Sequence, residues 1–153
     1  KYTHGTPFRR VIEENLIDPK KYVILGLRGG LYDPDDLKWA IEQGITIITT
    51  DKFYEIGMAE SIKIIKDTIG DTPTYFTFDI DGIDPTYAPG TGTPEVGGIN
   101  VHEAQLLIRD LKDLNFIGAD VVEVSPPFDV NNMTSLVGAS IAFEILCTMT
   151  KTN

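Results

Sequence analysis

The chain has 153 residues, enough for one domain with a sizeable core, and we expect a single α/β domain spanning residues 1–153. Its formal net charge of −10 excludes a nucleic-acid backbone or an anionic membrane surface as the natural partner, whereas a small cation suits it. Cys147, the only cysteine, cannot form an internal disulfide, and the longest apolar stretch is too short to span a bilayer. We therefore expect a soluble cytoplasmic protein in which Cys147 lies in the core.

Helices and strands alternate through the first half of the chain. Thr6 predicts the N-cap of a helix that begins at Pro7, because proline is favoured at the first helical position. Short apolar runs at residues 22–27 and 45–48 predict strands, and Gly44 ends the helix between them. This strand-helix-strand order is typical of parallel strands.

The second half repeats the alternation and ends in a strongly apolar helix. Asn100 and Glu103 have the spacing of a capping box at the start of a helix. The expected elements are a helix at residues 55–69, a strand at 75–79, a helix at 100–114, a strand at 117–124 and a helix at 134–150. The last helix is apolar nearly all round, so we expect it to be buried. Four strands joined by helices predict an α/β fold with a parallel sheet covered on both faces.

Three aspartates follow the apolar run of residues 75–78. Ligands of α/β sheets bind beyond the carboxyl ends of such strands, and alternation with period two would point Asp79 and Asp81 the same way. Carboxylates held that close repel one another unless a proton or a cation neutralises them. The cluster of Asp79, Asp81 and Asp84 therefore predicts a metal site, with a solvated acidic loop as the alternative.

Three further features are expected at the same end of the sheet. A glycine- and proline-rich loop covers residues 87–98, Glu123 lies near the end of the next strand, and His4 lies near the start of the chain. Long loops inside a compact domain are usually functional. Together with the aspartates, a histidine that moves protons and a carboxylate that holds a cationic group indicate a hydrolytic metal site.

The sequence around these residues resembles the ureohydrolase family of arginases and agmatinases. Three ordered motifs carry the resemblance: Phe-Asp-Ile-Asp-Gly-Ile-Asp-Pro at residues 78–85, Ala-Pro-Gly-Thr-Gly-Thr-Pro-Glu-Val-Gly-Gly at 88–98, and Val-Glu-Val-Ser-Pro at 122–126. The opening Thr-His-Gly-Thr-Pro-Phe-Arg at residues 3–9 is similar to the agmatinase branch. The resemblance implies a three-layer α/β/α fold with a mainly parallel sheet, as in arginase.

The same resemblance implies a chemistry and roles for four residues. It implies two manganese ions bridged by a hydroxide that attacks a guanidinium carbon, with release of urea and an amine. Asp79 and Asp81 would be metal ligands, and Asp84 would support them. His4 would be a proton shuttle near the mouth of the site, and either His4 or Asp81 would give the leaving amine its proton.

Substrate binding is implied for Glu123 and Thr93. Glu123 would pair with the substrate guanidinium, a planar cation for which a carboxylate is the natural bidentate partner. Thr93 and the neighbouring loop backbone would line the pocket. The partner is thus expected to be a small cationic guanidino compound, and agmatine, guanidinobutyrate and guanidinopropionate all stay open.

Two motifs of the family are missing from this sequence. Ureohydrolases carry Gly-Gly-Asp-His and Asp-Ala-His-x-Asp motifs that supply the other metal ligands, and both would precede His4. The other histidine, His102, is expected on the surface in the first turn of a helix. We therefore interpret the chain as the carboxyl-terminal half of an agmatinase-like enzyme. We expect this half alone neither to hold the metal pair nor to turn over, and the full-length protein to be a homo-oligomer.

Two alternative functions remain, and the role of Arg28 is also undecided. Asp79 and Asp81, followed by Gly82, also fit a magnesium phosphatase with a nucleophile and a general acid, although that leaves Glu123 unexplained. A non-catalytic fragment that keeps the fold without the metals is the other alternative. For Arg28, which follows the first strand, we favour a structural ion pair over a substrate or subunit contact.

Overall fold

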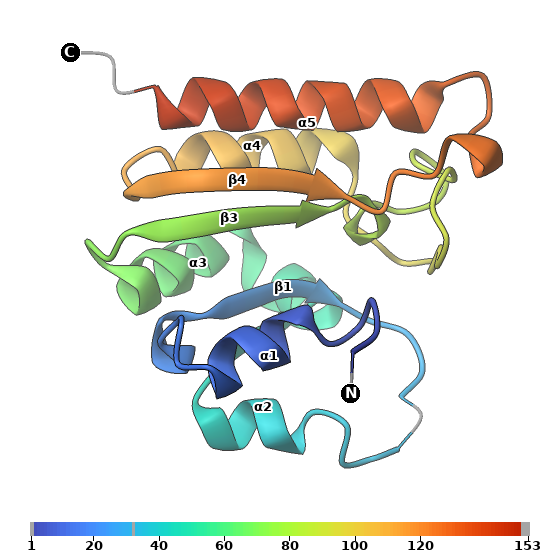
Figure 1. Cartoon of the computed structure of the whole chain (residues 1–153). Coiled ribbons are helices and arrows are strands. Elements are labelled where there is room, and N and C mark those ends of the chain that lie inside the picture. The colour runs from blue at the N-terminus through green and yellow to red at the C-terminus, as the bar shows by residue number, and fades with distance from the viewer. Residues whose placement is uncertain (1, 32, 151–153) are drawn as a thin grey trace.

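The four predicted strands are present, but they form two separate parallel pairs. The computed structural model describes residues 2–31 and 33–150, and the strands within them are β1 (Val23–Leu27), β2 (Thr46–Thr49), β3 (Thr74–Asp79) and β4 (Phe116–Val122). β1 pairs with β2 and β3 pairs with β4, both in parallel, and the arrows of β3 and β4 point the same way in Figure 1. The expected parallel pairing is therefore confirmed. One continuous four-stranded sheet is not found among the described residues, because alternation of elements does not determine which strands become neighbours.

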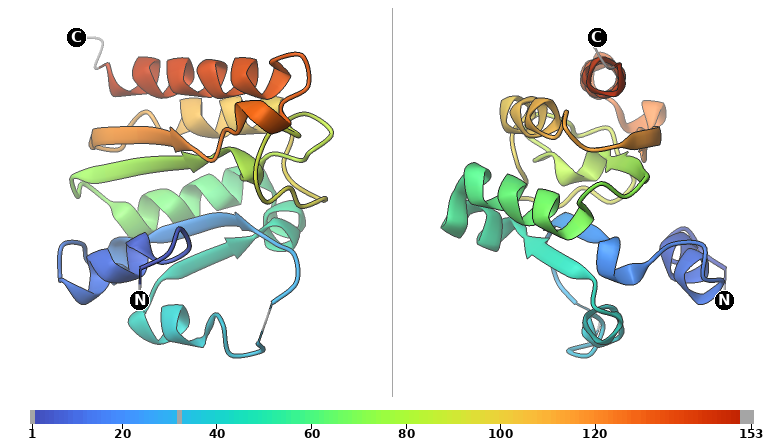
Figure 2. Two further views of the ribbon diagram at one scale, coloured as in Figure 1. Left: turned by 45° about the vertical axis from the view of Figure 1, so that its right-hand side comes forward. Right: turned by 90° about the vertical axis from the view of Figure 1, so that its left-hand side faces the viewer.

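The helices lie on both sides of the strand layer. They are α1 (Pro7–Glu13), α2 (Lys38–Gln43), α3 (Thr50–Ile69), α4 (Val101–Asp110) and α5 (Met133–Met149). Viewed along the strands, α3 and α4 lie on one side and α1 lies on the other (Figure 2). α5 packs against α4 and β4. The three-layer α/β/α arrangement expected for the chain is thus confirmed.

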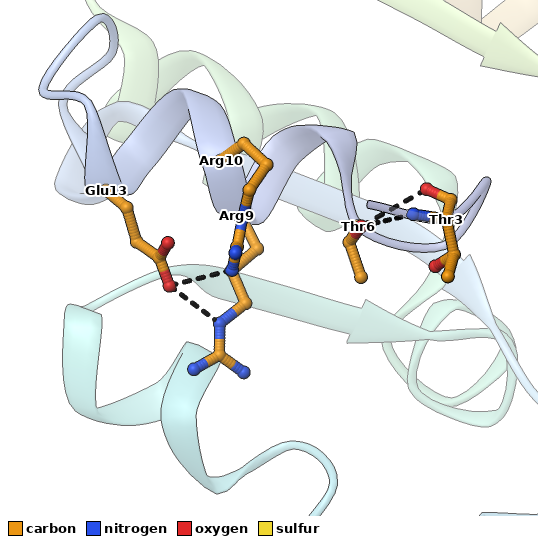
Figure 3. Close-up of polar contacts among 5 residues, drawn as sticks. All are labelled: Thr3, Thr6, Arg9, Arg10 and Glu13. Atoms are coloured by element: carbon orange, nitrogen blue, oxygen red, sulfur yellow. Dashed lines mark hydrogen bonds and ion pairs between the residues drawn. The ribbon is translucent and has the colours of Figure 1, made fainter. Parts of the chain in front are cut away.

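The segment before α1 is held by hydrogen bonds between Thr3 and Thr6. The Thr6 side chain does not cap the helix; its hydroxyl donates to the Thr3 carbonyl at 3.1 Å and accepts from the Thr3 amide at 3.0 Å (Figure 3). Within α1, Arg9 and Arg10 both pair with Glu13, at 3.0 and 2.8 Å (Figure 3). Thr6 is thus the N-cap residue and Pro7 the first helical residue, as predicted, although the Thr6 side chain makes no capping hydrogen bond.

Helix α3 begins five residues before the predicted start at residue 55. The Thr49 hydroxyl accepts a hydrogen bond from the Lys52 amide at 3.1 Å, so Thr49 is the N-cap of this earlier start. Gly57 then interrupts the helix with φ 80° and ψ 167°, a conformation open to glycine. The apolar periodicity revealed mainly the segment after this kink, and the prediction therefore missed the first turn.

The core consists mainly of branched aliphatic side chains from α3, α4, α5 and the loop after β3. Its most buried members include Ile48, Ile80, Ile83, Ile108 and Ile141, each exposed by 2 % or less. Two of them, Ile80 and Ile83, alternate with the three aspartates of residues 79–84, the acidic loop. Full burial of one such side chain contributes roughly 1.5–3 kcal/mol, so these two isoleucines anchor the loop to the body of the protein.

Helix α5 is only half covered, which corrects two predictions. Val137, Ile141 and Ile145 are buried against the rest of the chain, whereas the large side chains Leu136, Phe143 and Leu146 are 62–65 % exposed. Cys147 is also exposed, not in the core. An apolar pattern all round a helix predicts burial, but only the side facing α4 and β4 finds neighbours here. No helix within the described residues is long and apolar enough to cross a membrane.

Candidate metal and substrate site

Asp79 and Asp81 lie side by side at the carboxyl end of β3. Asp79 closes the strand, and a 3-10 turn (Ile80–Gly82) follows immediately. The Asp81 amide donates a hydrogen bond to the Asp79 carboxylate at 3.1 Å. The tight turn, and not the predicted two-residue alternation, therefore brings the two residues together, because the strand has already ended at Asp79.

The charges around Asp79 favour a cation at this position. Partial desolvation of its carboxyl is the main cause that raises its pKa from 3.8 to about 7, and the charges of Asp81 and Glu123 act in the same direction. The hydrogen bond from the Asp81 amide opposes them. At neutral pH the negative charge on Asp79 is therefore held at a cost that a bound cation would offset.

Thr93 and Glu123 lie beside this pair. The Thr93 hydroxyl donates to the Asp81 carboxylate at 3.0 Å, across twelve residues of sequence. Glu123 follows β4 with φ 63°, an unusual conformation for a non-glycine residue and one that is often found at functional sites. A Cβ atom on Gly92 would lie 4.0 Å from the Glu123 carboxylate, which places that carboxylate next to the loop that carries Thr93.

Asp84 faces the glycine-rich loop. Its carboxylate accepts hydrogen bonds from the amides of Thr86 (2.9 Å), Gly97 (2.8 Å) and Gly98 (3.2 Å), and from the Thr86 hydroxyl. The bonds from Thr86 are the main cause that lowers its pKa to about 2, with those from the two glycines adding to it. A Cβ atom on Gly98 would lie 2.5 Å from the Asp84 backbone nitrogen, so this close approach requires glycine. The support that Asp84 would give to the metal ligands stays a prediction.

Arg28 reaches the same edge from the end of β1. Its guanidinium donates to the backbone carbonyls of Gly26, Asp81, Glu95 and Val96. None of the ion pairs among the described residues includes Arg28, so the favoured structural ion pair is wrong. The sequence shows that Arg28 follows the first strand, but nothing local in the sequence indicates that it binds a loop more than fifty residues away.

Neither histidine forms a hydrogen bond or an ion pair with the carboxylate pair among the described residues. His4 is exposed in the turn between Thr3 and Thr6, and in the part of the chain that the structure describes it makes no hydrogen bond or ion pair with Asp79, Asp81 or Glu123. Its role in proton transfer stays a prediction. His102 is exposed in the first turn of α4, as expected, where Asn100 and Glu103 form the predicted capping box.

The donor set fits part of a manganese site. Asp79 and Asp81 offer carboxylate oxygens, the ligand type that suits manganese or magnesium more than zinc. Within residues 2–31 and 33–150, no group of three or more His, Cys, Asp or Glu side chains is arranged to hold a metal ion. These residues would therefore supply two of the ligands that an octahedral site requires, and a metal would need further donors.

Comparisons with known proteins identify the family. Residues 1–148 match the model of the arginase family. The chain belongs to the arginase family. It is 53 % identical over 146 residues to guanidinopropionase from Pseudomonas aeruginosa, a match that covers 95 % of this chain and 46 % of that relative. It is 42 % identical over 149 residues to guanidinobutyrase from the same organism, with 97 % and 47 % covered.

A solved structure supports the same conclusion for the fold. Proclavaminate amidino hydrolase from Streptomyces clavuligerus superposes with a TM-score of 0.92 at 42 % identity, over 97 % of this chain and 49 % of that one. This chain therefore has an arginase-family fold and spans about half the length of the relatives that it matches. The resemblance to ureohydrolases is confirmed, and the phosphatase alternative finds no support among these proteins.

Proposed function

We propose that this chain contributes the Asp79/Asp81 ligand pair and the guanidinium-binding carboxylate of a manganese-dependent enzyme that hydrolyses a guanidino compound to urea and an amine. One observation carries the proposal: two carboxylates are held together at the end of β3. The Thr93 hydroxyl donates a hydrogen bond to one of them, and Glu123 lies beside them. The family membership supports this chemistry, since its relatives include guanidinopropionase and guanidinobutyrase.

Each residue has a role that its contacts support. Asp79 and Asp81 would hold a manganese pair together with ligands from outside this chain, and the metal when bound supplies a water whose pKa is lowered. The Thr93 hydroxyl fixes the orientation of the Asp81 carboxylate. Glu123 would accept two parallel hydrogen bonds from a guanidinium. Asp81 or His4 would transfer a proton to the leaving amine.

The substrate in this proposal is a small cationic guanidino compound. The carboxylates of Asp79, Asp81 and Glu123 give the site a negative charge that suits a guanidinium. The two Pseudomonas aeruginosa relatives are named for guanidinopropionate and guanidinobutyrate, which makes ω-guanidino acids the first compounds to test, with agmatine beside them. A cytoplasmic location and a homo-oligomeric full-length enzyme belong to the same proposal.

A chimaera tests the function directly. This chain would replace the matching segment of guanidinopropionase, and urea release would be measured with added Mn²⁺ on guanidinopropionate, guanidinobutyrate and agmatine. We expect urea release that falls at least about a hundredfold in Asp81→Ala, the loss expected for a metal ligand. Arg109→Lys, which alters an ion pair between α4 and α5, is the matched control and should retain activity. A folded chimaera in which Asp81→Ala releases urea at the unsubstituted rate would contradict the proposal.

The chain on its own is expected to be inactive. Two carboxylates do not complete the coordination of manganese, so the purified 153-residue chain should bind the ion weakly and release no urea. Steady urea release from the isolated chain with added manganese would contradict this expectation.

A further inference from the structure

Arg28 connects three segments that the sequence separates widely. One of its terminal nitrogens donates to the carbonyls of both Asp81 and Glu95, at 2.6 Å each. Its Nε donates to the carbonyls of Glu95 at 3.2 Å and Val96 at 3.3 Å, and the other terminal nitrogen donates to Gly26 at 3.3 Å. The guanidinium thus ties the end of β1 to the acidic loop and to the glycine-rich loop.

The two tied loops are the ones that meet in the candidate site. Asp81 lies in the acidic loop, and Thr93, whose hydroxyl binds the Asp81 carboxylate, lies two residues before Glu95. Arg28 therefore fixes the backbone on both sides of the Thr93 to Asp81 hydrogen bond. All five hydrogen bonds of its guanidinium among the described residues go to backbone carbonyls.

The rest of the glycine-rich loop is anchored without Arg28. The Asp84 carboxylate holds the amides of Gly97 and Gly98, and a bridge joins Ile83 to Ile99. Residues 92–96 are exposed, and within them the hydrogen bonds to Arg28 are made by the carbonyls of Glu95 and Val96. Loss of Arg28 should therefore free residues 92–96 and leave residues 97–99 in place.

We propose that Arg28 is a positioning residue, whose guanidinium holds the glycine-rich loop that carries Thr93 against the acidic loop that carries Asp81. The inference rests on the proposed function, because it takes Asp79 and Asp81 as metal ligands. A lysine cannot take over this role, since its ammonium is a single point of charge, whereas the planar fork of arginine directs several N–H groups to carbonyls on different segments. Charge alone is thus insufficient at this position.

The test is an NMR titration of the ¹⁵N-labelled 153-residue chain with Mn²⁺, whose unpaired electrons broaden nearby amide signals. In the wild type, we expect the amides of residues 79–82 and 92–93 to broaden at the same Mn²⁺ concentration. In Arg28→Lys and Arg28→Met, residues 79–82 should still broaden, whereas residues 92–93 should require a Mn²⁺ concentration severalfold higher.

A metal-free measurement accompanies the titration. The heteronuclear ¹⁵N NOE of residues 92–96 should fall in both Arg28 variants, and that of residues 97–99 should not. The Asp81 amide, which is hydrogen-bonded to Asp79, should exchange with solvent about tenfold faster, because its loop loses a charge-assisted hydrogen bond. Arg109→Lys, which alters an ion pair between α4 and α5, is the matched control and should change none of these readouts.

The outcomes separate this inference from the function on which it rests. A wild type without localised broadening at residues 79–82 would overturn the proposed metal site, while the metal-free readouts would still decide the role of Arg28. Wild-type values in both Arg28 variants would overturn the positioning role. Full rescue by lysine would overturn the requirement for the fork, and loss of dispersed signals throughout α5 would show Arg28 to be a residue of global stability instead.

Discussion

Asp79 and Asp84 lie five residues apart in one loop and have opposite electrostatic environments. Asp79 has few hydrogen-bond donors and two neighbouring carboxylates, and its pKa is raised to about 7. Asp84 accepts hydrogen bonds from the amides of three residues and from a hydroxyl, and its pKa is lowered to about 2. The same residue type is thus poorly satisfied at the start of the loop and well supplied with hydrogen bonds at its end.

The difference shows what separates a ligand from a structural carboxylate. A carboxylate whose lone pairs are occupied by the protein's own N–H groups has little left to offer a cation, and its removal destabilises the fold. A carboxylate that is left under-satisfied beside like charges is unfavourable until a cation arrives. Three predictions test this contrast between Asp79 and Asp84, and a fourth tests the backbone at the neighbouring Glu123.

The largest expected effect is on stability. Asp84→Asn should lower the free energy of unfolding by about 2 kcal/mol, because an amide NH₂ would replace an oxygen that accepts charge-assisted hydrogen bonds. The matched substitution Asp79→Asn should leave stability unchanged or raise it, since it removes a like charge and can still accept from the Asp81 amide. Urea denaturation of the three proteins at pH 7.5 in chelator measures this, and equal losses in both variants would contradict the contrast.

The pH dependence of stability should differ in sign between the two aspartates. The contribution of Asp84 is present above the ordinary pKa of 3.8 and is lost as the pH falls through about 2. That of Asp79 is full below 3.8 and is lost as the pH rises through about 7. In metal-free solution, Asp79→Asn should therefore flatten the decline in stability between about pH 4 and pH 7. Asp84→Asn should flatten only the loss of stability that occurs as the pH falls below about 4. A decline that persists in Asp79→Asn would refute the shift of its pKa.

Glu123 provides a smaller test on a third carboxylate of the same region. Its positive φ disfavours residues with a Cβ atom, so Glu123→Gly should be about 1 kcal/mol more stable than Glu123→Ala. That difference is the local cost of holding a carboxylate at this position. Thermal unfolding of the two variants measures the difference, and equal stability would mean that the backbone at this position is not strained.

Local sequence patterns predicted a good part of the fold and of the site. The capping box of Asn100 and Glu103, the stop at Gly44 and the apolar strand before the acidic loop depend on nearby residues, and the structure has all three. The motif that contains Asp79 and Asp81 directed attention to the end of β3, where the structure holds these two residues together.

Features that depend on distant parts of the chain could not be predicted. The separation of the strands into two pairs, the exposed side of α5 and the contacts of Arg28 are all set by which segments pack together in three dimensions. The different environments of Asp79 and Asp84 belong to the same class, because the amides of Gly97 and Gly98 that stabilise Asp84 come from more than ten residues away.

The contrast between the two aspartates is tested most directly by Mn²⁺ electron paramagnetic resonance, in which the free ion gives the signal and the bound ion does not. At equal protein and Mn²⁺ concentrations, the wild-type chain should reduce the free-ion signal, if only weakly, and folded Asp84→Asn should reduce it equally. Asp79→Asn should lose that reduction. Equal Mn²⁺ binding by Asp79→Asn and the wild type, or a loss confined to Asp84→Asn, would contradict the assignment of Asp79 as the ligand and Asp84 as the structural carboxylate.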